Sequence, residues 1–340
     1  MGKTYRVAIL GATGLVGQTM AAVLAERGFP IEELRLLASA RSDGDTVSWR
    51  DRTLVVTEAN DRSFDGIDVA LFSAGADISH HFAPIAAAAG AVVIDNSSAW
   101  RMDPAVPLVV PEVNSDDALD HQGIIANPNC STIQLVVALN PLHLVNPIRR
   151  IVVDTYQSVS GTGKAAVEEL REQISASVSE SGVIPSPSVY PHQIAFNVLP
   201  HIDTFQEDGS CKEEWKIVQE TRKIMHEPSI RIVATTVRVP VITSHSEAVH
   251  VDFSRPMSVT EVRDVLASAP GVLLRDDPIS NLYPTPLNST GRDEVFVGRL
   301  RPNDVFDNGI SMWVVADNIR KGAATNAVQI AEVLVARGAI

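Results

Sequence analysis

The chain of 340 residues has few cysteines and no apolar segment long enough to cross a membrane. Only Cys130 and Cys211 occur, which argues against a disulfide framework and agrees with a reducing, cytoplasmic environment. The longest alanine-rich run, at 83–94, is broken by Pro84 and Gly90, so no membrane-spanning helix is expected. The first residues lead directly into an expected strand, without the pattern of a signal peptide.

Metal-ligand spacing and positive charge are also scarce. None of the nine histidines forms a His-x-x-x-His pair with a nearby acid, so no metal site is predicted. There are 28 basic against 41 acidic residues, a net charge of −13, which argues against nucleic acid or an anionic membrane as a partner. An anionic small molecule would have to bind where a few arginines and lysines converge.

The order of expected elements differs between the two parts of the chain. In the first part, strands at 4–10, 34–38, 68–73 and 91–95 alternate with helices at 18–27 and 83–89. This alternation predicts an α/β fold with a Rossmann-type doubly wound parallel sheet. The second part has β-rich segments at 149–156, 230–241 and 248–253 and helices at 164–177 and 211–226. It is therefore expected to form a separate α+β domain.

These patterns give the expected domain boundaries. The first domain should cover 1–130 and the second 131–318, while 319–340 should carry a final helix that returns to the first domain. The stretch 179–197 contains several prolines and serines, so it is expected to be a long ordered loop.

A glycine-rich turn between the first expected strand and helix indicates a nucleotide site. Such a turn lets a pyrophosphate approach the N-terminus of a helix. Its candidate cofactor-binding residues are Gly11, Thr13, Gly14, Leu15, Val16 and Gly17.

The end of the second expected strand bears on which nucleotide binds. NAD sites usually carry an acid there, but this strand leads into Ser39, Arg41 and Ser42, with no acid before Asp43. Hydroxyl groups and a guanidinium suit a 2′-phosphate, so NADP is favoured over NAD. The alternative is a solvent-exposed turn that happens to contain one arginine.

Cys130 has the surroundings of a reactive thiol. It follows Pro128 and Asn129 and precedes Ser131, Thr132 and an apolar run, which is typical of the start of a helix. The positive end of the helix dipole would favour its thiolate. Because most unpaired cysteines are small buried hydrophobic residues, the spacing alone leaves both interpretations open.

Several motifs together resemble those of the bacterial-type aspartate-semialdehyde dehydrogenases over nearly the whole chain. They are the segments 11–17, 97–101, 127–132, 157–163, 190–197, 238–241 and 245–247. The resemblance implies NADPH-dependent reductive dephosphorylation of L-aspartyl 4-phosphate to L-aspartate 4-semialdehyde, through an acyl thioester on cysteine. It also implies a place in lysine, threonine, methionine and diaminopimelate biosynthesis, and a homodimer formed by the second, catalytic domain.

The resemblance also implies roles for individual residues. Catalysis would fall to Cys130 as nucleophile, His245 as general acid/base and Gln157 as an orienting group. Substrate and phosphate binding would fall to Arg101, Asn129, Glu213, Lys216 and Arg238. Ser160, Gly161 and Asn318 would line the nicotinamide end of the cofactor.

Three alternatives stay open. The enzyme could reduce another acyl phosphate or an acyl-CoA on the same frame, although Arg238 with Glu213 suits a substrate that carries both a carboxylate and an amine. The chain could also be a non-catalytic dinucleotide-binding protein. Finally, Glu213 and Lys216 are three residues apart on a charged helix and could simply be a solvated pair.

Overall fold

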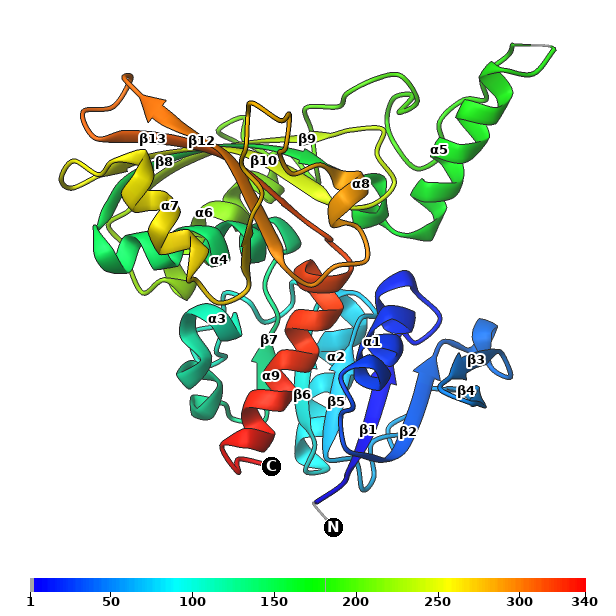
Figure 1. Ribbon diagram of the computed structural model, residues 1–340. Coiled ribbons are helices and arrows are strands. Elements are labelled where there is room, and N and C mark those ends of the chain that lie inside the picture. The colour runs from blue at the N-terminus through cyan, green and yellow to red at the C-terminus, as the bar shows by residue number, and fades with distance from the viewer. Residues whose placement is uncertain (1–2, 181) are drawn as a thin grey trace. The chain divides into compact units, whose positions relative to one another are not determined.

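The computed structural model describes residues 3–180 and 182–340, and the chain divides into two compact units (Figure 1). One unit contains the described residues up to Asn129 together with Ala323–Ile340, and the other contains Cys130–Gly322. The expected domain boundaries after residues 130 and 318 concern parts of the chain that fold independently, and they remain a prediction.

The first unit is built on a seven-stranded sheet with the order β3-β4-β2-β1-β5-β6-β7. Its strands are β1 (Tyr5–Leu10), β2 (Ile31–Ala38), β3 (Thr46–Trp49), β4 (Arg52–Glu58), β5 (Val69–Phe72), β6 (Val92–Asp95) and β7 (Ile124–Ala126). All neighbouring strands are parallel except β3 and β4, which form an antiparallel hairpin at one edge. The predicted Rossmann-type sheet is confirmed, whereas the edge hairpin and β7 were not predicted.

Helices cover both faces of this sheet because its strands are apolar on both sides. Val7 and Ile9 of β1 belong to a core shared with α1 (Leu15–Glu26) and α9 (Thr325–Ala336). Ala8 and Leu10 instead face a second core, which includes Phe82 of α2 (Ala76–Ala88). Alternate side chains of one strand therefore pack into the two cores on opposite faces of the sheet, as a doubly wound fold requires.

Two helices of this unit begin earlier than expected. Helix α1 starts at Leu15 and α2 at Ala76, and both follow a glycine N-cap that offers no side-chain hydrogen bond. Helix α2 also contains Pro84 in its interior, a residue that normally limits a helix. Helix α9 belongs to the first unit and packs against α1 and β6. The remaining short helices of the unit are η1 (Ala40–Ser42), α3 (Pro111–Asn114) and η2 (Ser115–Asp120).

The second unit is built on a six-stranded mixed sheet with the order β11-β12-β13-β10-β8-β9. Its strands are β8 (Ile148–Gln157), β9 (Arg231–Arg238), β10 (His245–Phe253), β11 (Val272–Leu274), β12 (Val295–Asn303) and β13 (Gly309–Ala316). The last three were not predicted. Gly298 and Pro302 within β12 and Gly309 at the start of β13 are residue types that are depleted in strands, which explains the omission.

Helices of this unit pack on its six-stranded sheet. Helix α4 (Cys130–Val145) packs on β8, β12 and β13, α6 (Lys212–Ile224) packs on β9, and α7 (Val259–Ala267) packs on β11 and β12. The other helices are η3 (Val159–Thr162), α5 (Lys164–Ser177), α8 (Pro286–Ser289) and the π-helical turn η4 (Arg320–Ala324). The predicted helix at 164–177 is confirmed, and the described residues of 179–197 contain neither helix nor strand.

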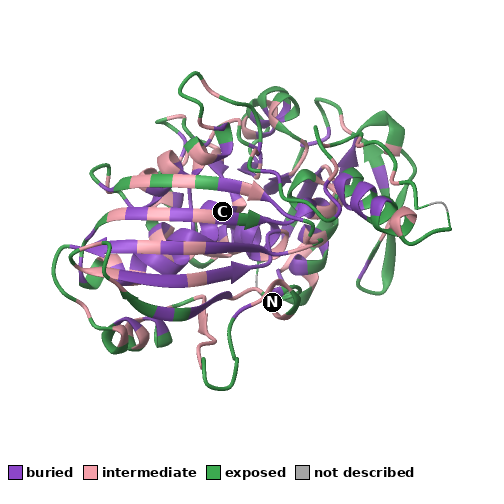
Figure 2. Cartoon of the chain, turned by 90° about the horizontal axis from the view of Figure 1, so that it is seen from above, coloured by how far each residue is buried: buried purple, intermediate pink, exposed green. Residues whose placement is uncertain are grey.

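One face of the six-stranded sheet is shown in Figure 2, where buried and more exposed positions alternate along the strands. Tyr156 of β8 is 40% exposed and Val233 of β9 is 57% exposed. In the described part of the chain, no helix is long and apolar enough to span a lipid bilayer.

Candidate active site

Chemically reactive side chains meet at one end of the six-stranded sheet. Strands β8 and β9 run parallel and end with the paired residues Gln157 and Arg238. Strand β10 runs antiparallel to β8, so its first residue, His245, lies at the same end. The end of β13 also lies there, because Ala316 pairs with His245. The strand order alone therefore brings three of the predicted site residues, Gln157, Arg238 and His245, to the same end of the sheet.

Cys130 is the first residue of α4, a helix of 16 residues with no acid in its first turn. The thiol is partly exposed and forms no disulfide. An unopposed helix dipole favours a thiolate at this position. The backbone of Gly322 approaches closely: a Cβ added to Gly322 would lie 2.9 Å from the Cβ of Cys130. A few residues after the end of β13, the backbone therefore lies next to Cys130.

The imidazole of His245 is fully buried and held in one orientation. Its Nδ1 accepts a hydrogen bond from the backbone N–H of Ser158 at 3.0 Å, so in the neutral ring the proton lies on Nε2. Nε2 is buried and has no hydrogen-bond partner among the described residues. Burial, and secondarily the charge of Arg238, lower the pKa of His245 well below its ordinary value. The ring is therefore a neutral donor whose N–H is available to a ligand.

Arg238 and Gly161 lie directly beside this ring. One terminal nitrogen of Arg238 donates to the carbonyl oxygen of Ser158 at 2.8 Å, and its buried Nε has no partner among the described residues. A Cβ at Gly161 would lie 3.0 Å from that terminal nitrogen of Arg238 and 3.2 Å from Nε2 of His245. A side chain at Gly161 would therefore crowd the donors of both residues.

Asn318 joins the loop after β8 to the loop before β10. Its Oδ1 accepts hydrogen bonds from the hydroxyl of Ser158 at 3.1 Å, the hydroxyl of Ser160 at 3.2 Å and the backbone N–H of Ser244 at 2.8 Å. The residues predicted for the nicotinamide end, Ser160, Gly161 and Asn318, therefore lie together with His245.

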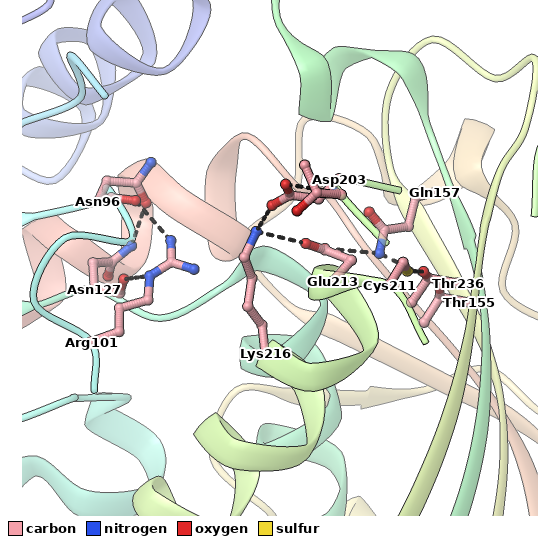
Figure 3. A network of polar contacts seen from close by, with 11 residues as sticks. Asn96, Arg101, Asn127, Thr155, Gln157, Asp203, Cys211, Glu213, Lys216 and Thr236 are labelled. Carbon is pink, nitrogen blue, oxygen red and sulfur yellow. Dashed lines mark hydrogen bonds and ion pairs between the residues drawn. The ribbon is translucent and has the colours of Figure 1, made fainter. Parts of the chain in front are cut away.

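Gln157, Glu213 and Lys216 form a continuous polar chain that ends on Asp203 (Figure 3). The amide nitrogen of Gln157 donates to Glu213 at 3.1 Å, and the ammonium of Lys216 contacts Glu213 at 3.2 Å and Asp203 at 2.7 Å. Glu213 is buried, so this is not the solvated pair that the helical spacing allows. Although partial burial opposes the effect, Lys216 lowers the pKa of Asp203. Asp203 was not predicted, because it lies in a loop without a motif.

Arg101 belongs to the first unit and is held by backbone carbonyls. Its Nε donates to the carbonyl oxygen of Asn127 at 3.0 Å, and a terminal nitrogen donates to that of Asn96 at 2.8 Å (Figure 3). Asn129, also buried, is the last residue of the first unit and directly precedes Cys130. Arg101 is thus fixed in its position by the turn after β6 and by the segment that leads to Cys130.

A cavity of about 550 Å³ lies in the first unit at the carboxyl ends of β1 and β2. The predicted cofactor residues that line it are Gly11, Thr13, Gly14, Ser39 and Arg41. Ser42 lies next to this set through a 3.3 Å contact between its hydroxyl and that of Thr13. Leu15, Val16 and Gly17 do not line the cavity but form the first turn of α1.

The residues of this cavity suit a dinucleotide. Gly11 has a φ of 88°, and a Cβ there would lie 2.4 Å from the carbonyl oxygen of Ser73. A Cβ at Gly17 would lie 2.2 Å from the carbonyl oxygen of Gly11, so the turn tolerates no side chain at either position. The N-terminus of α1, which has no side-chain cap, is left available for a phosphate.

Two acidic residues near the cavity, Asp43 and Glu58, bear on whether the site prefers NADP or NAD. Asp43 is engaged, because its carboxylate accepts the backbone N–H of Glu58 at 2.9 Å. Glu58 itself lines the cavity, since β4 pairs in parallel with β2 and places Glu58 opposite Ala38. Sequence reasoning missed Glu58, because strand pairing rather than sequence proximity brings it to this site.

Cys211 is the buried N-cap residue of α6, and its sulfur contacts the hydroxyl of Thr236 at 3.1 Å. Within residues 3–180 and 182–340, no group of three or more histidine, cysteine or acidic residues is arranged to hold a metal ion.

Comparison with known proteins agrees with this geometry. Residues 6–121 match the family model "Semialdehyde dehydrogenase, NAD binding domain", and residues 139–321 match "Semialdehyde dehydrogenase, dimerisation domain". The aspartate-semialdehyde dehydrogenase of Aquifex aeolicus is 57% identical over 99% of both chains, and that of Bacillus subtilis is 48% identical over 98% of both. A crystal structure of aspartate semialdehyde dehydrogenase II from Vibrio cholerae, complexed with ASA, covers 98% of this chain and 99% of its own at 48% identity, with a TM-score of 0.95.

Proposed function

Because the chain belongs to the aspartate-semialdehyde dehydrogenase family, we propose that it reduces L-aspartyl 4-phosphate to L-aspartate 4-semialdehyde and phosphate, reversibly and with NADPH. The observation that carries the proposal is the meeting of a neutral histidine donor, an arginine and a glutamine at one end of the six-stranded sheet, in a unit whose first helix begins at Cys130. In this role the enzyme would act in the cytoplasm, in lysine, threonine, methionine and diaminopimelate biosynthesis.

Cys130 is the proposed nucleophile. Its thiolate attacks the acyl carbon of the aspartyl phosphate, a carbon–sulfur bond forms, and the carbon–oxygen bond to phosphate breaks. Phosphate leaves with the electron pair of that bond, and the acyl group stays attached to the protein as a thioester. The position of Cys130 at the start of α4 supports the role, because the helix dipole stabilises the thiolate before attack.

His245 is the proposed hydrogen-bond donor to the reacting oxygen. When bound, NADPH would supply the hydride that reduces the thioester carbon. The Nε2–H of His245 donates a hydrogen bond to the oxygen on that carbon and stabilises its negative charge. Collapse of this tetrahedral oxyanion then breaks the carbon–sulfur bond and releases the aldehyde and the Cys130 thiolate. The hydrogen bond from Ser158 to Nδ1 supports this role, because it keeps the proton on Nε2. Gln157, held by Glu213, is proposed to orient the acyl group.

Substrate charge is recognised by a small set of side chains in this proposal. Arg238 binds the α-carboxylate, a role supported by its buried Nε, which has no hydrogen-bond partner among the described residues. Glu213 binds the α-ammonium group. Arg101, Lys216 and Asn129 are the residues proposed to hold the phosphate, and Lys216 is itself fixed by its contacts with Glu213 and Asp203.

The cavity of the first unit is the proposed NADP site. Ser39 and Arg41 line it and offer a hydroxyl and a guanidinium to the 2′-phosphate, with Ser42 beside them. Glu58 could instead accept a hydrogen bond from a ribose hydroxyl, so the choice between NADP and NAD depends on which of these contacts dominates. We favour NADP because the end of β2 itself carries no acid.

A homodimer is also proposed, formed through the second unit. The open face of the six-stranded sheet, with Tyr156 and Val233 partly exposed, is the surface suited to a second copy. A closed twofold dimer is the commonest arrangement for such a self-complementary surface.

The direct test is a steady-state assay in the phosphorylating direction, in which NADPH formation is followed with L-aspartate 4-semialdehyde, phosphate and NADP. The proposal expects activity that depends on all three and is lost when the substrate lacks its α-carboxylate or α-amine. A preference for N-acetylglutamate semialdehyde, or for coenzyme A in place of phosphate, would favour a related reductase. Absence of any turnover would favour a non-catalytic dinucleotide-binding protein.

A further inference from the structure

Glu247 is a fully buried carboxyl group to which the proposed mechanism gives no role. It lies in the middle of the six-stranded sheet on β10, where its direct neighbours are Thr155 of β8 and Val314 of β13. Neither neighbour carries a charge, and neither carboxyl oxygen reaches hydrogen-bond geometry with any described residue. A carboxylate in such a place is costly unless it is neutral or closely partnered.

Gln134 on α4 is also fully buried, and α4 packs on β8 and β13, the two strands that flank β10. Burial raises the pKa of Glu247 well above its ordinary value, and the nearby amide of Gln134 opposes part of that effect. Neither polar atom of the Gln134 amide has a hydrogen-bond partner among the described residues, and the same holds for the two oxygens of Glu247. The two groups are chemically matched, because a protonated carboxyl and an amide can each donate to the other.

The positions of the two residues relate them to the catalytic pair. Glu247 follows His245 by two residues on β10, which places both side chains on the same face of the sheet, about 7 Å apart along the strand. Gln134 follows Cys130 by four residues on α4, one turn or about 6 Å along the same face of the helix. Each element begins at a proposed catalytic residue, and one short step along it leads to one member of the buried pair.

We propose that Glu247, as a neutral carboxylic acid, forms with Gln134 a buried hydrogen-bonded pair that sets the register of α4 against β10 and thereby holds Cys130 in line with His245. Both are positioning residues, because neither touches the reacting atoms. The inference rests on the proposed roles of Cys130 and His245. It predicts that loss of the pair impairs the chemistry at Cys130 while substrate binding by Arg238 and Glu213 is retained.

The test compares Glu247→Leu, Gln134→Leu, Glu247→Gln and the exchanged double variant Gln134→Glu/Glu247→Gln. Three quantities are measured for each: kcat and KM in the phosphorylating direction, and the rate at which iodoacetamide alkylates Cys130, located by peptide mass spectrometry. Asn146→Leu is the matched control, since Asn146 is a buried amide beyond the far end of α4 that bonds to the carbonyl of Arg255.

Each leucine variant should lower kcat by roughly tenfold or more and slow alkylation, with KM for the semialdehyde changed about twofold at most. Glu247→Gln and the exchanged variant, which can still form an amide-to-amide or amide-to-acid pair, should recover most of kcat. Asn146→Leu should leave kcat and alkylation near the wild-type values even where it lowers the melting temperature.

Three results would overturn the inference. The first is a leucine variant with wild-type kcat and alkylation rate. The second is Glu247→Gln as impaired as Glu247→Leu, which would mean that a charged carboxylate is needed. The third is Asn146→Leu as impaired as Glu247→Leu, which would reduce the effect to general packing. Failure of the proposed function itself would be recognised separately, as a wild-type enzyme without semialdehyde activity or without alkylation of Cys130.

Discussion

The backbone N–H of Ser158 donates a hydrogen bond of 3.0 Å to Nδ1 of His245. This contact decides which ring nitrogen carries the proton, and it opposes protonation of the ring, because an imidazolium would place an N–H against an N–H. Burial and the charge of Arg238 act in the same direction. His245 therefore remains a neutral donor under conditions in which an exposed histidine would be half charged.

The first prediction concerns stability against pH. In the unfolded chain the ordinary histidine pKa is 6.5, whereas the folded protein resists protonation of His245. Below about pH 6.5 the unfolded state therefore binds a proton that the folded state does not, and the free energy of unfolding falls as the pH falls. The variant His245→Gln lacks this contribution, so the difference in stability between wild type and variant should shift towards the variant as the pH is lowered. Urea denaturation at several pH values measures it, and a difference independent of pH would contradict the assignment.

The second prediction concerns Gly161. A methyl group at this position would lie 3.0 Å from Arg238 and 3.2 Å from Nε2 of His245, tight enough to crowd both donors. Gly161→Ala should therefore lower kcat/KM for the semialdehyde by roughly tenfold or more, about 1.4 kcal/mol. The melting temperature should change little, because neighbouring side chains can shift slightly. An alanine variant with unchanged kcat/KM would show that these two donors do not face the substrate.

The third prediction concerns Arg41. Removal of its guanidinium should weaken NADP binding on the order of 1.5–3 kcal/mol, as expected for a lost charge-assisted hydrogen bond. Binding of NAD, which has no 2′-phosphate, should change much less. Arg52→Ala is the control, because Arg52 lies on the neighbouring strand β4 but does not line the cavity. Fluorescence titration with both nucleotides measures the effect, and an equal loss of NAD and NADP affinity in Arg41→Ala would remove the basis for NADP preference.

The fourth prediction concerns assembly. Val233 is exposed on the open face of the six-stranded sheet, so Val233→Arg should place a charge in the proposed dimer surface. Analytical ultracentrifugation should find a dimer for the wild type and a larger monomer fraction for the variant. Val55, exposed on β4 of the first unit, gives the matched control Val55→Arg, which should remain dimeric. A monomeric wild type with full activity would refute the proposed assembly.

The sequence predicted the elements whose pattern is local. The strand–glycine turn–helix of the first unit and the helix at 164–177 follow from apolar periodicity and turn residues, and both were found. Strands β11, β12 and β13 were not predicted, because glycine and proline within and beside them weaken the local strand pattern. Pairing with neighbouring strands nevertheless stabilises them in the sheet.

For the candidate site, motifs supplied residue types but not their contacts. Asp203 lies in a loop and contacts Lys216 through the fold of that loop. Glu58 lies at the nucleotide cavity because β4 pairs with β2. Neither relation follows from the spacing of residues in the sequence. The close approach of Gly322 to Cys130 also depends on the path of the π-helical turn η4. Such relations arise from tertiary packing, so only the folded chain reveals them.

The central claim is that Cys130 carries the acyl group as a thioester. The most direct measurement is a rapid-mixing experiment in which the wild type receives L-aspartate 4-semialdehyde and NADP without phosphate. The account predicts a burst of NADPH equal to the enzyme concentration, with the acyl adduct on the Cys130 peptide and its release when phosphate is added. Cys130→Ser should fold and bind NADP but give no burst. An adduct on Cys211, or full turnover by Cys130→Ser, would contradict the account.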